Sequence, residues 1–263
     1  MNILIINQPP FNRGDESAHK GLIRTLLKRF PSAKIKVMHE AWLSESYRQY
    51  DVHDERVKYI SEARGVMKFS RFFNHDVYTN HTWLWCWHPI YRWLEQTYKW
   101  ADIVVCAPGG ICMGGFQDWN HLYHLRLAQL FKRPLAYYGR SFGPFPTETE
   151  RNRQFKKISL DMLHYFGYLS IRDHKTELLA DELNIPYIST IDSAFLDSPK
   201  VEIPYELKSV VGDKPFMVFV PNYLLWHYAY KGRINHETVI NFYCKVMDEI
   251  WAANPELNIL MLP

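Results

Sequence analysis

The chain has 263 residues, of which 47% are hydrophobic and 22% charged, and its net charge is +3, which is ordinary for a soluble globular protein. This length allows one large domain or two smaller ones. The small charge and the lack of a basic run do not indicate a nucleic-acid-binding protein. No apolar stretch has the length of a membrane span.

The amino terminus and the cysteines bear on the compartment in which the protein works. The first ten residues contain a short apolar run with no charged segment before it, which predicts a strand and not a signal peptide. The four cysteines, which lack the paired spacing of a metal site, are Cys86, Cys106, Cys112 and Cys244. We therefore expect free thiols in a reducing cytoplasm.

The chain begins with a predicted strand, a polar loop and a helix. Residues 2–7 form the strand, and the apolar period of the sequence after the loop is helical. The loop contains Asn12, Gly14 and Asp15, and either Asp15 or Ser17 is placed to cap the helix.

The region before residue 100 is less regular and rich in aromatic residues. Residues 33–39 predict a second strand, whereas residues 40–70 allow no firm assignment. Residues 71–100 are crowded with Phe, Tyr and Trp, and a helix is expected from about residue 89 to residue 100. These side chains could pack in the core, which is their commoner role, or face a sugar ring or a membrane surface.

Residues 103–107 are an unbroken apolar run that predicts a parallel strand buried on both faces. Four glycines follow closely, and they are Gly109, Gly110, Gly114 and Gly115. They allow the backbone to turn sharply and to approach a ligand, although the loop could also merely turn the chain. A helix over residues 118–132, capped by Asp118, follows. Strand, glycine loop and helix form a ligand-binding arrangement in α/β sheets.

Further strands over residues 134–138, 168–171 and 186–190 alternate with helices over residues 147–165 and 175–183. This alternation predicts a doubly wound parallel sheet. Its strand ends are followed by polar residues and glycines, namely Asp15, Gly109, Gly110, Ser141, Gly143, Arg172 and Asp192. Because parallel strands end at one edge of the sheet, most of these residues should lie together.

The predicted domains are a Rossmann-like α/β domain over residues 1–197, a linker over residues 198–215 rich in proline and charge, and the start of a second Rossmann-like domain over residues 216–263. Two strands and one helix cannot bury both faces of a sheet. We therefore expect the second domain to be incomplete and the chain to be truncated.

Five short motifs follow one another along the first domain. They are Asn12, Gly14, Asp15 and Glu16 in an N-x-G-D-E loop, Asp102 before Gly109 and Gly110, Ser141, Gly143 and Pro144 in an S-x-G-P turn, the pair Arg172 and Asp173, and Asp192 before two small residues. Together they resemble the polysaccharide pyruvyl transferase family. Members of that family attach pyruvate from phosphoenolpyruvate, as a ketal, to sugars of bacterial and fungal surface polymers.

The chain also departs from the family pattern. Ile111 stands where the family usually has a third glycine, and Arg140 stands where it commonly has glutamine. Arg140 could bind a different acidic ligand, or it could pair with Asp118 or another helix carboxylate. The family's Arg-Leu-His motif, implicated in holding the donor, does not occur before the chain ends, so much of the donor side of the cleft would be lost.

The resemblance implies two Rossmann-like domains across a cleft, as in GT-B glycosyltransferases. It implies phosphoenolpyruvate as donor and a saccharide acceptor that could be lipid-linked, and this chemistry demands no cofactor and no divalent metal. From the charge and hydropathy of the sequence we expect no nucleic-acid partner and no membrane span. The enzyme would work in the cytoplasm or at the inner face of the membrane. The rival hypotheses are a GT-B glycosyltransferase that uses a nucleotide sugar and a saccharide-binding relative without catalysis.

The chemistry assigns expected roles to the residues of this site. An arginine can bind a carboxylate or a phosphate through two parallel hydrogen bonds, and Arg172 is the candidate. Asp15 and Asp192 are the candidate bases for the sugar hydroxyls, with helix cap and salt-bridge partner as their alternative roles. The expected substrate-binding residues are Asn12, Gly14, Gly109, Gly110, Arg140, Ser141 and Gly143.

The histidines give weaker signals. His121 and His124 share a helix at a spacing that could suit a metal, but an exposed or packed pair is far more common. His19 lies one helical turn beyond Asp15 and is a weaker alternative acid. His227 and His236 fall in the second domain and could approach the site from there.

Overall fold

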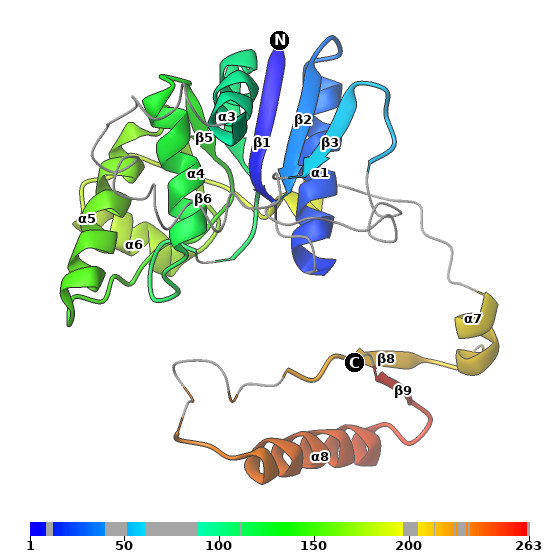
Figure 1. Cartoon of the computed structure of the whole chain (residues 1–263). Helices are drawn as coiled ribbons and strands as arrows, with labels where there is room; N and C mark the ends of the chain where they lie inside the picture. Colours follow the sequence, from blue (N-terminus) through cyan, green and yellow to red (C-terminus); the bar gives the residue numbers. More distant parts are fainter. Residues whose placement is uncertain are drawn as a thin grey trace. The chain divides into compact units, whose positions relative to one another are not determined.

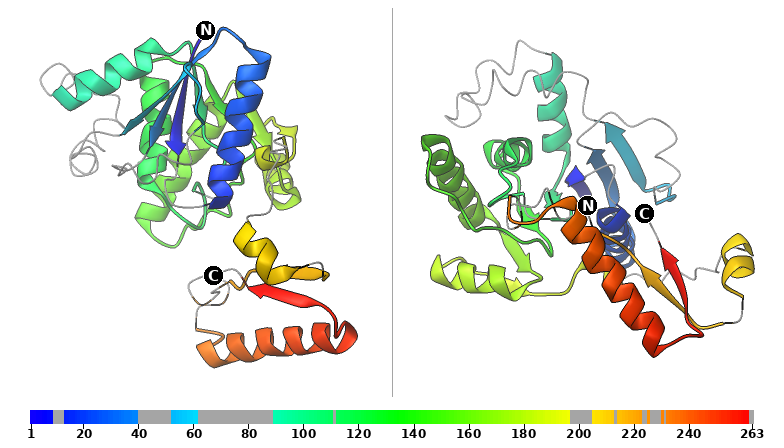
Figure 2. Two further views of the ribbon diagram at one scale, coloured as in Figure 1. Left: turned by 90° about the vertical axis from the view of Figure 1, so that its right-hand side faces the viewer. Right: turned by 90° about the horizontal axis from the view of Figure 1, so that it is seen from below.

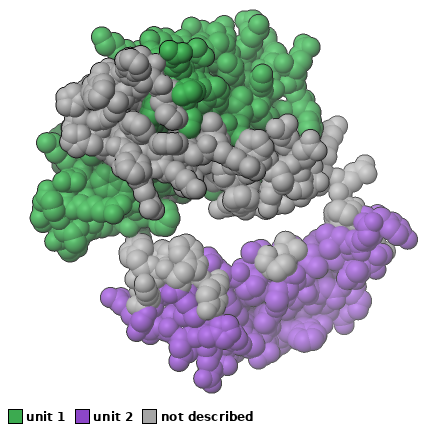
Figure 3. Space-filling model, in the orientation of Figure 1, with its two compact units in different colours: residues 1–198 green, residues 199–263 purple. Residues whose placement is uncertain are grey.

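The computed structural model describes residues 1–8, 13–39, 52–61, 89–110, 112–196, 205–212, 214–222, 225, 230 and 232–261. The chain divides into two compact units, residues 1–198 and residues 199–263, which are coloured separately in Figure 3.

The first unit is built on a sheet of seven strands (Figure 1). The strands are β1 (Asn2–Gln8), β2 (Lys34–His39), β3 (Val57–Ser61), β4 (Ile103–Cys106), β5 (Leu135–Tyr137), β6 (Tyr168–Ile171) and β7 (Ile188–Ser189). Their order is β3-β2-β1-β4-β5-β6-β7, and all neighbours are parallel. This order extends that of the Rossmann fold, so the predicted doubly wound α/β fold is confirmed.

Helices cover both faces of this sheet. They are α1 (Arg13–Arg29), α3 (Pro89–Trp100), α4 (Trp119–Leu130), α5 (Glu150–Tyr165) and α6 (His174–Glu182). Successive side chains of β1 point to opposite faces, as the pleat of a strand requires. Ile3 and Ile5 pack in the core layer that contains Leu22 and Ile23 of α1. Leu4 and Ile6 belong to the opposite layer, with residues of α3 and α4, and Figure 2 (left) shows the sheet between α1 and α3.

The start of α4 is fixed by the predicted cap. Asp118 has an extended backbone, and its Oδ1 accepts hydrogen bonds from the backbone N–H groups of Asn120 and His121, both at 3.0 Å. These bonds satisfy N–H groups that have no partner within the helix. The cap therefore fixes where the chain passes from the glycine loop into the helix.

Three features differ from the expectations. Helix α1 already begins at Arg13, so Asp15 lies in its first turn and is not its N-cap. Strand β3 occupies part of the region that had no assignment, because its half-buried edge position leaves no apolar run in the sequence. Residues 62–88 lie outside the described part of the chain, but Tyr91 and Tyr98 of α3 do pack in the core.

The second unit has a smaller βαβ element. It contains α7 (Tyr205–Val211), β8 (Phe216–Phe219), α8 (His236–Ala253) and β9 (Asn258–Met261), and β8 pairs with β9 in parallel. Helix α7 lies within residues 198–215, which were expected to be a linker. Val239 is the buried residue of α8, and both Phe242 and Trp251 are more than half exposed.

Candidate functional site

Charged side chains from four segments of the first unit meet beyond the carboxyl ends of its strands. Asp15 follows β1, Arg140 follows β5, Arg172 follows β6 and Asp192 follows β7. The charges of Arg140, Arg172 and Asp192 all act on the carboxyl group of Asp15. The predicted meeting of Asp15, Arg172 and Asp192 at one edge of the sheet is therefore what the structure shows, and Arg140, which was not part of that predicted group, joins them.

The carboxyl group of Asp15 is at the centre of this group of charges. It is half-buried in the first turn of α1. Burial raises its pKa, the two arginines lower it, Asp192 raises it, and the net shift is upward. A carboxyl group whose pKa moves towards neutrality can exchange a proton more readily near neutral pH. Its alternative role as a helix cap does not apply, because α1 begins before it.

Arg172 and Asp192 form a salt bridge between the ends of β6 and β7. The guanidinium Nη1 donates to Oδ2 of the carboxylate, and about a quarter of each side chain is exposed. The other oxygen of Asp192 accepts a hydrogen bond of 2.9 Å from the backbone N–H of Ala194. The pair is thus partly accessible to a ligand while its carboxylate is fixed by the backbone.

The segment after Asp192 is anchored to α1. The 3-10 helix Ser193–Leu196 follows directly, and the fully buried hydroxyl of Ser193 donates to the carbonyl oxygen of Ala18 at 2.7 Å. Ala18 lies one helical turn beyond Asp15. This hydrogen bond ties the end of β7 to the first turns of α1, which explains how Asp192 and Asp15 come within electrostatic range of each other.

Arg140 is buried, with 1% of its surface exposed. Its Nε donates to the carbonyl oxygen of Gly110 (3.2 Å), and its Nη1 donates to that of Ala107 (2.8 Å). It therefore does not pair with Asp118, which caps α4. These hydrogen bonds fix the backbone of the glycine loop to the guanidinium. A role of Arg140 in binding substrate stays a prediction. A non-local contact of this kind has no signal in the sequence.

Gly109 separates the two charged groups that lie nearest the loop. A Cβ atom at this position would be 3.0 Å from Oδ1 of Asp15 and 3.1 Å from Nη2 of Arg140. Any side chain there would press on both groups. Gly110 differs, because a Cβ atom there would meet no atom within 4 Å. The loop therefore offers open space at Gly110 and close contact at Gly109.

The Ser141–Gly143 turn has structural contacts of its own. The hydroxyl of Ser141 donates to the carboxylate of Asp173, which caps α6 through the backbone N–H of Thr176. Gly143 has a φ of +72°, and a Cβ atom there would lie 2.0 Å from Cδ2 of Leu179. Both residues fix the turn, and their binding to substrate stays a prediction.

Two of the remaining predicted binding residues fall at the start of α1. Gly14 is an exposed residue of its first turn, whereas Asn12 lies outside the described residues. Backbone N–H groups at the start of a helix favour anions, so this position is consistent with the expected role of the loop.

The histidine pair of α4 belongs to the core. His121 and His124 are buried, and Nδ1 of His124 lies 3.0 Å from the hydroxyl of Tyr98. Burial, and then the charge of Arg140, lower the pKa of His121. Within the described ranges no group of three or more His, Cys, Asp or Glu side chains could hold a metal ion. Both histidines are therefore packing residues.

His19 is a buried residue of α1, and burial, with the charges of His39 and Lys20, lowers its pKa to about 3. A histidine with this pKa has no proton to donate near neutral pH, so its suggested role as an acid does not fit the structure. In the second unit, His236 is the first residue of α8, and His227 lies outside the described residues.

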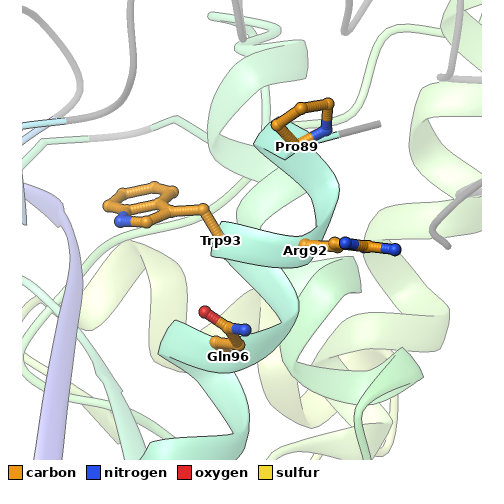
Figure 4. Close-up of a pocket in the computed structure, with 4 residues that line it drawn as sticks. All are labelled: Pro89, Arg92, Trp93 and Gln96. Carbon is orange, nitrogen blue, oxygen red and sulfur yellow. The ribbon is translucent and has the colours of Figure 1, made fainter. Parts of the chain in front are cut away.

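A separate hollow of about 250 Å³ lies along the first turns of α3 (Figure 4). It is lined by Pro89, Arg92, Trp93 and Gln96. None of the charged residues at the strand ends contributes to it. We therefore place the candidate site at the group of charges and not at this hollow.

No helix in the described part of the chain is apolar and long enough to cross a bilayer.

Several solved structures are similar to the chain. A protein described as a UDP-N-acetylglucosamine 2-epimerase from Listeria monocytogenes is 10% identical, with a TM-score of 0.45, and the match covers 100% of this chain and 62% of that one. The E. coli ADP-heptose lps heptosyltransferase II is 15% identical, with a TM-score of 0.34, and the match covers 99% of this chain and 64% of that one. An E. coli structure described as trehalose-6-phosphate bound with UDP-2-fluoro glucose is 11% identical, with a TM-score of 0.42, and the match covers 100% of this chain and 73% of that one. The chain thus spans less than two thirds of the first two.

No curated protein sequence matches the chain significantly. The model of one protein family, described as polysaccharide pyruvyl transferase, matches residues 12–255. This match runs from the loop before α1 to the residues just after α8 and includes all five motifs noted in the sequence. The resemblance inferred from those motifs is confirmed, and the chain belongs to the polysaccharide pyruvyl transferase family.

Proposed function

We propose that this protein transfers pyruvate from phosphoenolpyruvate to a saccharide, as a ketal, in the synthesis of a cell-surface polymer or exopolysaccharide. The family match supports the general reaction. The observation that carries the proposal to particular residues is the meeting of Asp15, Arg140, Arg172 and Asp192 at the carboxyl edge of the sheet. The proposal includes a second Rossmann-like domain that faces the first across a cleft, as in GT-B glycosyltransferases. It also includes a cytoplasmic location.

Arg172 is the proposed anchor for the donor. Phosphoenolpyruvate carries a carboxylate and a phosphate, and a guanidinium can bind either one with two parallel hydrogen bonds. In the free protein one N–H group of Arg172 is bonded to Asp192, and the side chain is partly exposed. An incoming anion would share the guanidinium with Asp192 or replace it.

Asp15 and Asp192 are the proposed groups for proton transfer. Ketal formation adds a proton to the methylene carbon of the donor, and two sugar hydroxyls each lose a proton as their oxygens bond to the adjacent carbon and phosphate leaves. Asp15 is suited to this because its carboxyl group is half-buried and its pKa is raised by burial. Asp192 would accept a proton from a sugar hydroxyl after the donor has replaced it as the partner of Arg172.

A binding experiment on the full chain tests the donor and its anchor. A ligand raises the stability of the folded state by about 2.7 kcal/mol at a concentration one hundred times its dissociation constant. We expect millimolar phosphoenolpyruvate to raise the melting temperature of the wild type but not of Arg172→Ala. Arg153→Ala is the matched control, because Arg153 is exposed on α5 and pairs only with nearby Glu150 among the described acidic residues.

A second variant separates lost binding from a broken salt bridge. Asp192→Asn removes the charge that neutralises Arg172 but keeps the guanidinium, so the stabilisation by phosphoenolpyruvate should persist. If Asp192→Asn and Arg172→Ala both lose it, Arg172 acts through the salt bridge and not as the anchor. Stabilisation by a nucleotide sugar, with none by phosphoenolpyruvate, would contradict the proposed reaction.

A further inference from the structure

The buried guanidinium of Arg140 has sulfur atoms among its acceptors. Its Nη2 donates to Sγ of Cys112 at 3.1 Å, and its Nη1 lies 3.5 Å from Sγ of Cys106. Its remaining hydrogen bonds go to the backbone carbonyls of Ala107 and Gly110. No carboxylate in the described part of the chain forms a salt bridge with Arg140. A permanent cation thus lies between two thiols and two neutral carbonyl groups.

This arrangement favours an anion at sulfur. An arginine stays protonated in a protein, and a buried charge without an opposite partner is costly. A neutral thiol is a weak acceptor, whereas a thiolate gives a charge-assisted bond, and a neighbouring cation promotes ionisation of a cysteine. Ionisation of one thiol would therefore give Arg140 a counter-charge in direct hydrogen-bond contact with the guanidinium.

The other titratable groups near the cation are His121, Tyr137 and Asp15. Burial lowers the pKa of His121 and raises the pKa of Tyr137, so both are neutral near pH 7. The charge of Arg140 acts on the carboxyl group of Asp15, but Gly109 lies between the two groups, and the sulfur atoms are the side-chain acceptors in hydrogen-bond contact with the guanidinium among the described residues.

The two cysteines differ in access. Cys106 is fully buried at the end of β4, where its sulfur is also 3.7 Å from Nδ2 of Asn7 and 3.8 Å from Nε2 of His121. Cys112 is partly exposed. We propose that Cys112 is a nucleophilic thiolate held by Arg140 and a modification site for small electrophiles and hydrogen peroxide.

The oxidation can be written with all atoms accounted for. The thiolate sulfur of Cys112 attacks one oxygen of hydrogen peroxide, the S–O bond forms and the O–O bond breaks. The hydroxide that leaves takes up a proton and becomes water, while the sulfur is oxidised to sulfenic acid. Because Arg140 also bonds to the carbonyl groups of the glycine loop, a change at the sulfur alters the group that holds that loop in place. This inference does not depend on the proposed transferase activity.

Pulse labelling of the full chain with iodoacetamide tests the proposal. The thiolate displaces iodide and forms an S–C bond, so the labelling rate follows the thiolate fraction. Peptides that contain Cys112 and Cys244 are quantified by mass spectrometry from about pH 6 to about pH 9, a window that includes the usual titration of a thiol near 8.5. Cys244 is exposed and serves as the reference thiol of the same chain.

We expect the labelling midpoint of Cys112 to lie at least about one pH unit below that of Cys244, a tenfold larger ratio of thiolate to thiol. In Arg140→Gln the two midpoints should coincide, whereas Arg140→Lys should keep part of the difference. A wild-type midpoint of Cys112 equal to or above that of Cys244 would overturn the proposal.

A second measurement covers the case in which the Arg140 variants do not fold. Thiolates absorb in the ultraviolet where thiols do not, so the pH-dependent absorbance of the wild type minus that of Cys112→Ser reports Cys112 alone. A step at or above the usual titration range of a thiol would also contradict the proposal. Treatment with hydrogen peroxide should give sulfenic acid at Cys112 and leave buried Cys106 reduced.

Discussion

Buried His19 should make the first unit sensitive to acid. It is 3% exposed, and its Nε2 lies 3.4 Å from the hydroxyl of Tyr59. The ring of Tyr59 contacts the rings of both His19 and His39. Burial, and then the charges of His39 and Lys20, lower the pKa of His19 from 6.5 to about 3. The folded protein therefore keeps His19 neutral at pH values where the unfolded chain protonates it.

The size of the effect follows from proton linkage. Between pH 6.5 and pH 3 the unfolded state binds nearly one proton more at His19 than the folded state does. The free energy of unfolding therefore falls as the pH falls through this window, by up to about 1.4 kcal/mol per pH unit. The whole window amounts to about 5 kcal/mol, which is similar to the total stability of a small domain. Above pH 6.5 the contribution no longer changes.

Urea unfolding at about pH 6.5 and about pH 5 measures this term. The wild type should lose about 2 kcal/mol more than His19→Gln between the two pH values, because glutamine does not titrate. His164→Gln is the matched control, since His164 is exposed on α5, and its loss should match that of the wild type. Equal losses in the wild type and His19→Gln would refute the reasoning, since they would mean that His19 is protonated alike in both states.

Two further predictions concern the loops that support the site. Gly143→Ala should lower the free energy of unfolding by more than about 1 kcal/mol, because φ is +72° and the new Cβ would collide with Leu179. Thermal unfolding measures this loss. Gly115→Ala is the control and should cost much less, because a Cβ at Gly115 meets open space. Asp118→Ala should cost about 1 kcal/mol by removing the cap of α4. Asp161→Ala on the exposed face of α5 is its control, and equal losses in urea unfolding would contradict the capping role.

The elements of the sheet could be predicted because their signals are local. The apolar run of β4 and the alternation of β2 are visible in the sequence, and each predicted strand from residue 2 to residue 190 is present in the structure. Strand β3 could not be predicted, since its side chains are only half-buried at the edge of the sheet and pair with β2 on one side. The first turn of α1 was missed because the capping preference of aspartate outweighed the helical pattern before it.

The candidate site was predictable in its position and less so in its contacts. Parallel strands place their carboxyl ends at one edge, so the grouping of Asp15, Arg172 and Asp192 follows from topology alone. The contacts of Arg140 do not, because Cys106 and Cys112 precede it by 34 and 28 residues and meet it only in the folded sheet. A charged residue in a sequence gives no sign of whether it will be buried beneath a loop or exposed to a ligand.

The two arginines of the site have different electrostatic surroundings, which suggests a division of labour. Arg172 is partly exposed and neutralised by Asp192, so an anion that binds there must compete with a carboxylate that the backbone of Ala194 already holds. Arg140 is buried and has no described salt-bridge partner, so its charge acts on the thiols and on Asp15 at every stage of binding. The first arginine can respond to a ligand by changing partners, whereas the second can only set the charge around the ligand. A bound anion should therefore reorganise the Arg172–Asp192 pair and leave the contacts of Arg140 as they are.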